Sequence, residues 1–146
     1  SIGIRGVKDT TGSLATFQER IKYVPLSQCD YVIGTESLLV PAYYLGVRGC
    51  ISGLSNAFPE LVASLFHTLE QKNETAIQHF QEKIQGVKNL IQKYPKMEIF
   101  YALLNMRGIP YGKALAPFGE LSEDEKEIIQ SALSKMNLFE RNSTYS

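Results

Sequence analysis

The chain has 146 residues, 44% of them apolar, and fifteen basic residues balance fifteen acidic ones. This composition predicts a folded globular domain with a sizeable core and excludes a disordered chain. The zero net charge gives no basis for binding nucleic acid or an anionic membrane surface, and no apolar run approaches the roughly 20 residues of a membrane span.

The first predicted element is a short apolar run that contains Ile4 and Val7 and stops at Lys8. Such a run is typical of a buried parallel strand, and it places Lys8 at the carboxyl end of that strand. Residues 9–13 (Asp-Thr-Thr-Gly-Ser) then predict a turn that caps a following helix. Enzymes built on α/β barrels keep their chemistry at this end of the strands.

Lys8 is therefore a candidate catalytic residue. Burial of its stem would lower the pKa of the amine from about 10.4 to roughly 7–8. A neutral amine can attack a ketone and form a Schiff base. The alternative is a lysine that extends from the strand end into solvent and pairs with Asp9.

Helical and strand patterns alternate up to residue 59. We predict a helix over 14–24, a strand over 31–33, a helix over 38–45, a strand over 48–53 and a loop over 54–59. Pro41 falls in the first turn of its helix, and Gly46 ends that helix. Strands linked this closely by helices predict right-handed crossovers and a parallel sheet. The ends of the three strands, at Lys8, 34–37 and 52–56, should converge on one edge.

From Pro59 onward the pattern becomes helical. Apolar stripes predict a helix over 61–69, a long helix over 77–91 that stops near Pro95, and a third over 99–104. Residues 106–121 hold three glycines and two prolines and predict a loop. Residues 122–125 (Ser-Glu-Asp-Glu) are typical of a capping box at the start of the last helix.

The two cysteines, Cys29 and Cys50, lack the spacing of a metal site. We expect a reduced thiol at each position, in or next to a strand, which favours a cytoplasmic protein. A disulfide between them is the alternative. We expect no metal ion.

Three spaced motifs carry a resemblance to a known family. They are Gly6-Val7-Lys8-Asp9, then Gly34-Thr35-Glu36, then residues 46–56 with Gly46, Gly49, Ile51 and Ser52. They resemble the motifs of the dihydrodipicolinate synthase and N-acetylneuraminate lyase family, the Schiff-base class I aldolases on a (β/α)8 barrel. In that pattern Lys8 matches the family's lysine, Gly34 and Glu36 match the end of the next strand, and the third motif matches the last strand.

The resemblance implies an α/β fold that is the C-terminal portion of a (β/α)8 TIM barrel, strands six to eight, over residues 1–73. A C-terminal extension of three helices would occupy residues 74–146. Because the whole barrel takes about 250 residues, we expect the missing N-terminal half as a separate chain, and a homotetramer of the complete enzyme. The threonine pair that holds the pyruvyl carboxylate and the tyrosine that relays protons belong to that half. Thr10 and Thr11 are not that pair.

Within the family, residues 9–11, 99–105 and 122–125 look most like the archaeal 2-keto-3-deoxygluconate aldolases. The resemblance implies cleavage of a 2-keto-3-deoxy sugar acid to pyruvate and an aldehyde, with Lys8 forming the Schiff base and no cofactor. Dihydrodipicolinate synthase, which condenses pyruvate with aspartate semialdehyde, is the alternative. A non-catalytic relative is the alternative from another class.

The remaining substrate-binding candidates follow from the same resemblance. Gly34 and Gly53 would let substrate approach the backbone closely. Glu36, with Thr35 beside it, would hydrogen-bond hydroxyls of the aldehyde half, and Ile51 would pack beside the imine. Sialic acid lyases have a serine where this chain has Gly53, which argues against a nine-carbon substrate.

Overall fold

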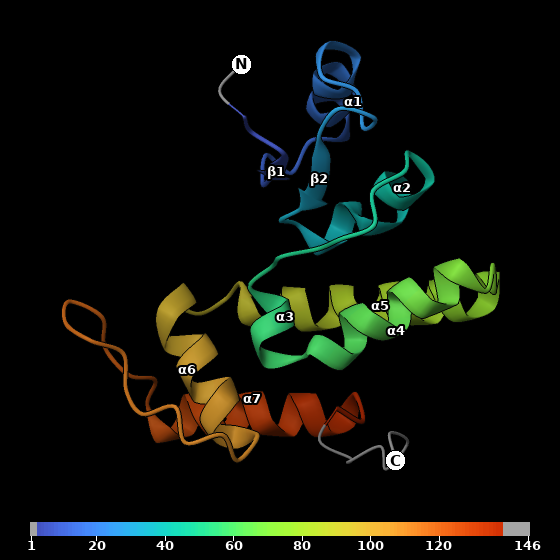
Figure 1. Cartoon of the computed structure of the whole chain (residues 1–146). Helices are drawn as coiled ribbons and strands as arrows, with labels where there is room; N and C mark the ends of the chain where they lie inside the picture. The colour runs from blue at the N-terminus through green and yellow to red at the C-terminus, as the bar shows by residue number, and fades with distance from the viewer. Residues whose placement is uncertain (1–2, 139–146) are drawn as a thin grey trace. The chain divides into compact units, whose positions relative to one another are not determined.

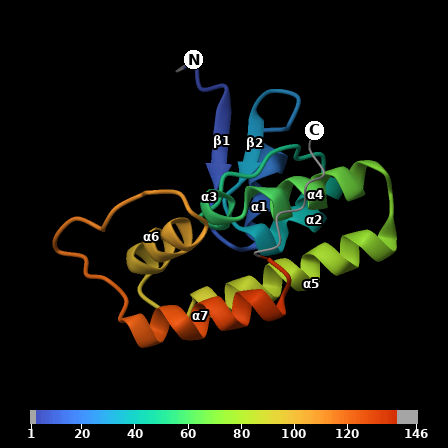
Figure 2. The same ribbon diagram turned by 90° about the horizontal axis from the view of Figure 1, so that it is seen from below.

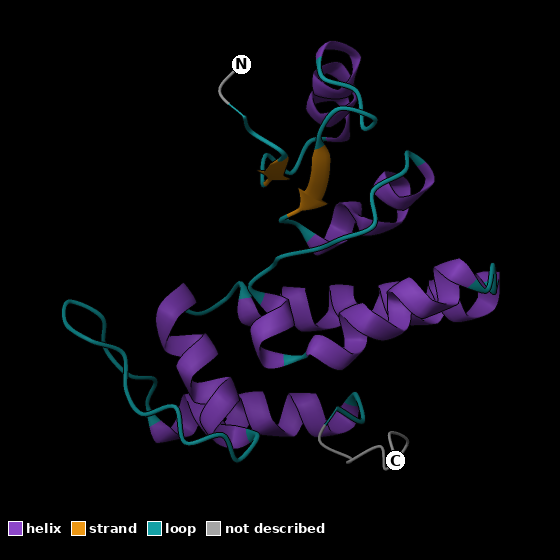
Figure 3. Cartoon of the chain, in the orientation of Figure 1, coloured by secondary structure: helices purple, strands orange, loops and turns teal. Residues whose placement is uncertain are grey.

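The computed structural model describes residues 3–138, in which helices predominate (Figures 1 and 3). The elements in chain order are β1 (Gly6–Asp9), α1 (Leu14–Tyr23), β2 (Asp30–Ile33), the 3-10 helix η1 (Glu36–Leu38), α2 (Leu39–Tyr44), α3 (Leu54–Ala57), α4 (Pro59–Glu70), α5 (Glu74–Ile91), α6 (Lys96–Met106) and α7 (Glu123–Lys135). The chain divides into two compact units, one ending at Ile84 and the other starting at Gln85. The predicted domain boundary after residue 73 falls in the turn before α5 and stays a prediction.

The two strands form a parallel sheet, with Lys8 opposite Val32 and Asp9 opposite Ile33 (Figure 2). The β-branched and aromatic residues of β2, Asp-Tyr-Val-Ile, favour an extended backbone. Helix α1 connects the two strands. The predicted parallel strand–helix–strand order is therefore confirmed over residues 6–33. The expected burial of the first strand is wrong, because three of the four residues of β1 are not buried and Ile4, which lies before the strand, is 65% exposed; Ile2, also placed in this strand by the sequence, lies outside the described residues.

The strand predicted over residues 48–53 is reduced to one parallel bridge, between Ile33 and Cys50. Two hydrogen bonds hold it, from the Ile33 amide to the Gly49 carbonyl at 3.0 Å and from the Ile51 amide to the Ile33 carbonyl at 2.9 Å. Gly49 allows a close approach, since a Cβ there would lie 2.8 Å from Val32 Cγ1. Glycine weakens a strand by its backbone entropy, which explains why the pairing stays this short.

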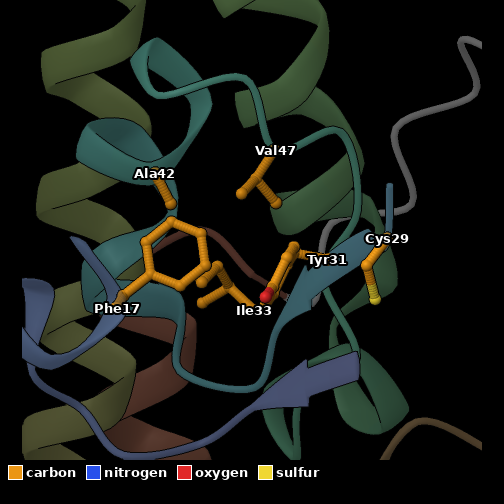
Figure 4. Close-up of a cluster of buried hydrophobic side chains, with 6 residues drawn as sticks. All are labelled: Phe17, Cys29, Tyr31, Ile33, Ala42 and Val47. Atoms are coloured by element: carbon orange, nitrogen blue, oxygen red, sulfur yellow. The ribbon is translucent and has the colours of Figure 1, made fainter. Parts of the chain in front are cut away.

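One face of the sheet is packed against a buried apolar cluster formed by Phe17, Cys29, Tyr31, Ile33, Ala42 and Val47 (Figure 4). Phe17 and Tyr31 meet edge to face, with ring centroids 5.5 Å apart. Because side chains alternate along a strand, Tyr31 and Ile33 face this cluster while Val32 and its partner Lys8 face the other way. The opposite face of the sheet therefore carries Lys8.

The helix ends follow the sequence signals. Ser13 caps α1 by accepting a hydrogen bond from the Thr16 amide at 3.2 Å. Gly46 ends the α2 turn with φ of +106°, a conformation that favours glycine. The predicted loop over 54–59 instead contains the four-residue helix α3, because a side chain distant in sequence binds its first amide, as described below.

The unit that starts at Gln85 contains the end of α5, α6, a long loop and α7 (Figure 3). Ser122 and Glu125 form the predicted capping box in both directions. Asn105 holds the loop by donating to the Gly112 carbonyl and accepting from the Tyr111 amide. Within residues 3–138, no helix is both long enough and apolar enough to cross a bilayer.

Candidate active site

The turn after β1 is built around the Asp9 carboxylate, which is 1% exposed. Its Oδ1 accepts hydrogen bonds from the Thr11 amide at 2.9 Å and the Thr11 hydroxyl at 2.6 Å. Its Oδ2 accepts from Arg20 Nη1, on α1, at 2.6 Å. These bonds fasten the end of the strand to the helix that follows it.

Opposing effects act on the pKa of Asp9. Burial raises the pKa, but the hydrogen bonds from Thr11 and the charge of Arg20 outweigh burial and lower it below its ordinary value. The carboxylate is thus kept ionised as part of the turn. Arg20 and Thr11 bind the Asp9 carboxylate. Asp9 is therefore not paired with Lys8, as the alternative interpretation of the sequence proposed.

Lys8 lies on the other face of the strand, and its stem extends over Gly34. A Cβ at Gly34 would lie 2.9 Å from Lys8 Cε and would also collide with the Thr10 side chain. The structure thus brings together two of the predicted site residues. The expected burial of Lys8 is wrong for residues 3–138, in which Lys8 is exposed.

Glu36 lies at the start of η1 and is only 9% exposed. Its Oε1 accepts a hydrogen bond from the Leu54 amide at 3.1 Å. This bond crosses eighteen positions of sequence and fixes the segment that follows Gly53 to the end of β2. Ser52 is also buried, and its Oγ accepts a hydrogen bond from the Ser55 amide at 3.3 Å. The two hydroxyl oxygens of Ser52 and Ser55 are hydrogen-bonded at 2.9 Å. Together these contacts shape the turn from 52 to 55.

Burial raises the pKa of the Cys50 thiol, and a hydrogen bond with Ser52 opposes the rise. The segments that were predicted to converge are joined in pairs: Lys8 lies against Gly34, and Glu36 binds the Leu54 amide.

The other candidates have less defined surroundings. Thr35 precedes η1 and is partly buried, and its side chain does not cap that helix. Gly53 is partly buried, and Ile51 has 56% of its surface exposed. Their predicted contacts with substrate stay predictions. Residues 3–138 contain no cluster of three histidine, cysteine or acidic side chains that could hold a metal ion.

The hydrogen bonds between Asp9 and Thr11 were not predicted from the sequence. The two residues have the two-residue spacing of an Asx turn, which was a usable signal. Arg20 and the packing of Thr10 over Gly34 gave no local signal, because both depend on how α1 and β2 are placed.

Two parallel strands joined by a helix, with a third segment bridged to the second strand, define a segment of an α/β fold. The Dihydrodipicolinate synthetase family model matches residues 2–136. The chain therefore belongs to this family, as the three motifs predicted.

Individual relatives agree with this assignment. A 4-hydroxy-tetrahydrodipicolinate synthase of Methanocaldococcus jannaschii is 28% identical over 136 residues, which cover 92% of this chain and 46% of the relative. A 2-dehydro-3-deoxy-D-gluconate/2-dehydro-3-deoxy-phosphogluconate aldolase of Thermoproteus tenax is 25% identical over 133 residues, which cover 90% and 43%. The solved dihydrodipicolinate synthase of Bacteroides thetaiotaomicron has a TM-score of 0.83 at 23% identity, and the match covers 92% of this chain and 47% of that structure.

The fold is thus that of a part of a TIM barrel of this family. The chain spans less than half the length of these relatives.

Proposed function

We propose that this chain supplies the Schiff-base portion of a class I aldolase. The observation that supports the proposal is the position of Lys8, which ends a parallel strand, faces away from the apolar cluster and lies over Gly34. Two residues beyond Gly34, the Glu36 carboxylate binds the Leu54 amide and so joins the 52–55 segment to this strand end. An amine placed at this edge can meet a ketone presented by the rest of the site.

In the proposed reaction the Lys8 amine attacks the C2 ketone of a 2-keto-3-deoxy sugar acid, and water leaves to give a protonated imine. The C3–C4 bond then breaks, and its electron pair moves toward the imine nitrogen. The proton of the C4 hydroxyl goes to a base outside this chain, which frees the aldehyde. The enamine takes a proton at C3, and hydrolysis of the imine releases pyruvate and restores the amine.

The substrate-binding roles belong to the same proposal. Gly34 and Gly53 would allow substrate to approach the backbone, and Ile51 would pack beside the imine. Thr35 and Glu36 would face the hydroxyls of the aldehyde half. The Glu36 carboxylate already accepts a hydrogen bond from the Leu54 amide. A substrate hydroxyl would therefore have to donate to one of the carboxylate's remaining acceptor sites.

Dihydrodipicolinate synthase activity is the second candidate, and the relative from Methanocaldococcus jannaschii favours it. Both reactions share the Lys8 imine with pyruvate and differ in the aldehyde partner. The resemblance to the 2-keto-3-deoxygluconate aldolases at residues 9–11 and 99–105 favours the sugar acid.

We further infer that β1, β2 and the segment at Cys50 correspond to strands six to eight of the barrel. The rest of the enzyme would then supply the first five strands, and the complete enzyme would be a homotetramer. The short parallel sheet of the described residues supports the first of these two inferences, because unpaired strand edges recruit a partner strand. The free thiols of Cys29 and Cys50 support a reducing compartment, for which we propose the cytoplasm.

The two reactions can be separated by assaying the complete enzyme, this chain together with the N-terminal half, against both partners. Release of pyruvate from 2-keto-3-deoxygluconate, with no condensation of pyruvate and aspartate semialdehyde, supports the aldolase. The reverse result assigns the synthase. If neither reaction occurs although the barrel is assembled, the chain belongs to a non-catalytic relative.

A further inference from the structure

The loop over residues 107–122 leaves the end of α6 and returns to the start of α7 (Figure 2). A cavity of about 110 Å³ lies between this loop, α6 and the first turns of α7. The α6 residues that line the cavity are three and four positions apart and so share one face of the helix: Glu98, Tyr101, Ala102, Asn105 and Met106. The cavity has room for about three or four water molecules, or for one small organic molecule.

Side chains of α6 hold the loop over this face. Asn105 binds the loop backbone through both ends of its amide, donating to the Gly112 carbonyl at 2.8 Å and accepting from the Tyr111 amide at 3.0 Å. Glu98 Oε1 accepts a hydrogen bond from the Gly119 amide at 3.0 Å. The walls are therefore in place before a ligand arrives, which lowers the cost of binding one.

The charges that line the cavity balance each other. Two carboxylates and two ammonium groups are present: Glu98, Glu120, Lys113 and Lys126. Lys113 pairs with Glu120 at 2.8 Å, and Lys126 pairs with Glu123 at 2.7 Å. An anionic ligand would meet the carboxylates and a cationic ligand the ammonium groups, so the lining favours a neutral molecule.

Polar atoms of the lining keep hydrogen-bonding capacity of both kinds. Within residues 3–138, neither Glu98 Oε2 nor the Tyr101 hydroxyl has a hydrogen-bond partner. The carboxylate oxygen can accept, the Lys126 ammonium has further N–H donors, and the Tyr101 hydroxyl can do either. Apolar surface lies beside these groups: Ala102, Met106 and Leu121. A ligand that matches this lining carries hydroxyl groups on a short carbon chain.

We propose that this cavity is a binding site for a small neutral polyol of about three carbon atoms. All of its lining residues belong to the unit that starts at Gln85, and no step of the proposed aldolase reaction uses them. The Tyr101 hydroxyl and the Glu98 carboxylate bind the hydroxyl groups of the ligand, and Ala102 contacts its carbon chain.

The test measures binding of glycerol to the complete enzyme by saturation-transfer NMR, with acetate and methylammonium as charged probes. We expect saturable binding of glycerol that is stronger than that of either charged probe. Tyr101→Phe removes one hydroxyl and keeps the ring, so glycerol should bind about threefold to tenfold more weakly, as the loss of one hydrogen bond predicts. Ala102→Leu fills the cavity and should abolish binding.

Tyr94→Phe and Ala132→Leu are matched controls, because they make the same changes in the same unit at residues that do not line the cavity. Both should bind glycerol as the unmodified enzyme does, and urea unfolding of every variant shows that it is folded. Lys8→Arg should also bind glycerol normally, which separates this site from the proposed Schiff-base site.

Three results would overturn the proposal. The first is the absence of saturable glycerol binding. The second is binding that neither Tyr101→Phe nor Ala102→Leu weakens, because glycerol would then occupy another part of the enzyme. The third is tighter binding of acetate or methylammonium than of glycerol, because the cavity would then select a charged ligand.

Discussion

Gly34 lies directly against the side chain of Lys8, so that any Cβ at residue 34 would come within 2.9 Å of Lys8 Cε. The glycine belongs to the end of one strand and the lysine to the end of its neighbour. Their contact joins two motifs that are twenty-six positions apart in the sequence. It also makes the space over Gly34 the most sensitive part of the candidate site.

Gly34→Ala should therefore displace both Lys8 and Thr10. We expect only a small loss of stability, because Lys8 Cε lies near the end of a flexible, exposed side chain that can move aside, but a clear loss of imine formation. Urea unfolding and pyruvate trapping measure the two effects. Gly119→Ala is the matched control, because a Cβ there meets nothing within 4 Å, and it should change neither. A Gly34→Ala protein that matches this control would show that the contact is unimportant.

The Asp9–Arg20 pair should make stability depend on acid. Since the pKa of Asp9 is lowered in the folded chain, its contribution is present above the ordinary value of 3.8 and is lost as pH falls through the folded pKa. Asp9→Asn should thus be less stable than the unmodified chain at pH 7, and the difference should shrink below pH 3.8. Thermal unfolding at a series of pH values measures it. A difference that stays constant on acidification would contradict the ion-pair account.

Glu36→Ala should release the Leu54 amide, which the carboxylate binds at 3.1 Å. Loss of one partner leaves a buried group unsatisfied and costs about 1–3 kcal/mol. Hydrogen exchange at Leu54 should accelerate in Glu36→Ala and change much less in Glu36→Gln, which keeps an acceptor oxygen. Unchanged exchange in the alanine variant would mean that the bond does not hold α3.

The capping box at α7 provides a test in the other unit. Ser122 accepts from the Glu125 amide at 3.3 Å, and Glu125 accepts from the Ser122 amide at 2.8 Å. Ser122→Ala should cost about 1 kcal/mol of stability. Ser131→Ala, at an exposed position in the middle of the same helix, should be neutral or slightly stabilising. Equal effects of the two substitutions would argue against the cap.

Local signals in the sequence were sufficient for most of the elements. Ser13, Gly46 and Ser122 predicted helix ends that the structure contains, because each acts through its own neighbours in sequence. The strand predicted over residues 48–53 is only one bridge in the structure, for a physical reason. Gly49 allows a close approach to Val32, but glycine gives the backbone little tendency to stay extended. Helix α3 was missed because its first amide is bound by Glu36, eighteen residues away.

The residues of the candidate site also fall into two groups, those that local motifs predicted and those that depend on packing between elements. Lys8, Gly34 and Glu36 were found through motifs, and the structure brings Lys8 against Gly34. Arg20 and Thr10 were not found, because their roles arise from packing between elements and not from spacing. Lys8 is exposed within residues 3–138, whereas the strand pattern predicted its burial.

The central claim is that the Lys8 amine captures a ketone. Its most direct test is borohydride reduction of the complete enzyme in the presence of pyruvate, followed by peptide mass analysis. We predict a reduced pyruvyl adduct on Lys8 and none in Lys8→Arg, which keeps the positive charge. An unmodified Lys8 in the assembled enzyme, or an adduct on another lysine, would contradict the account.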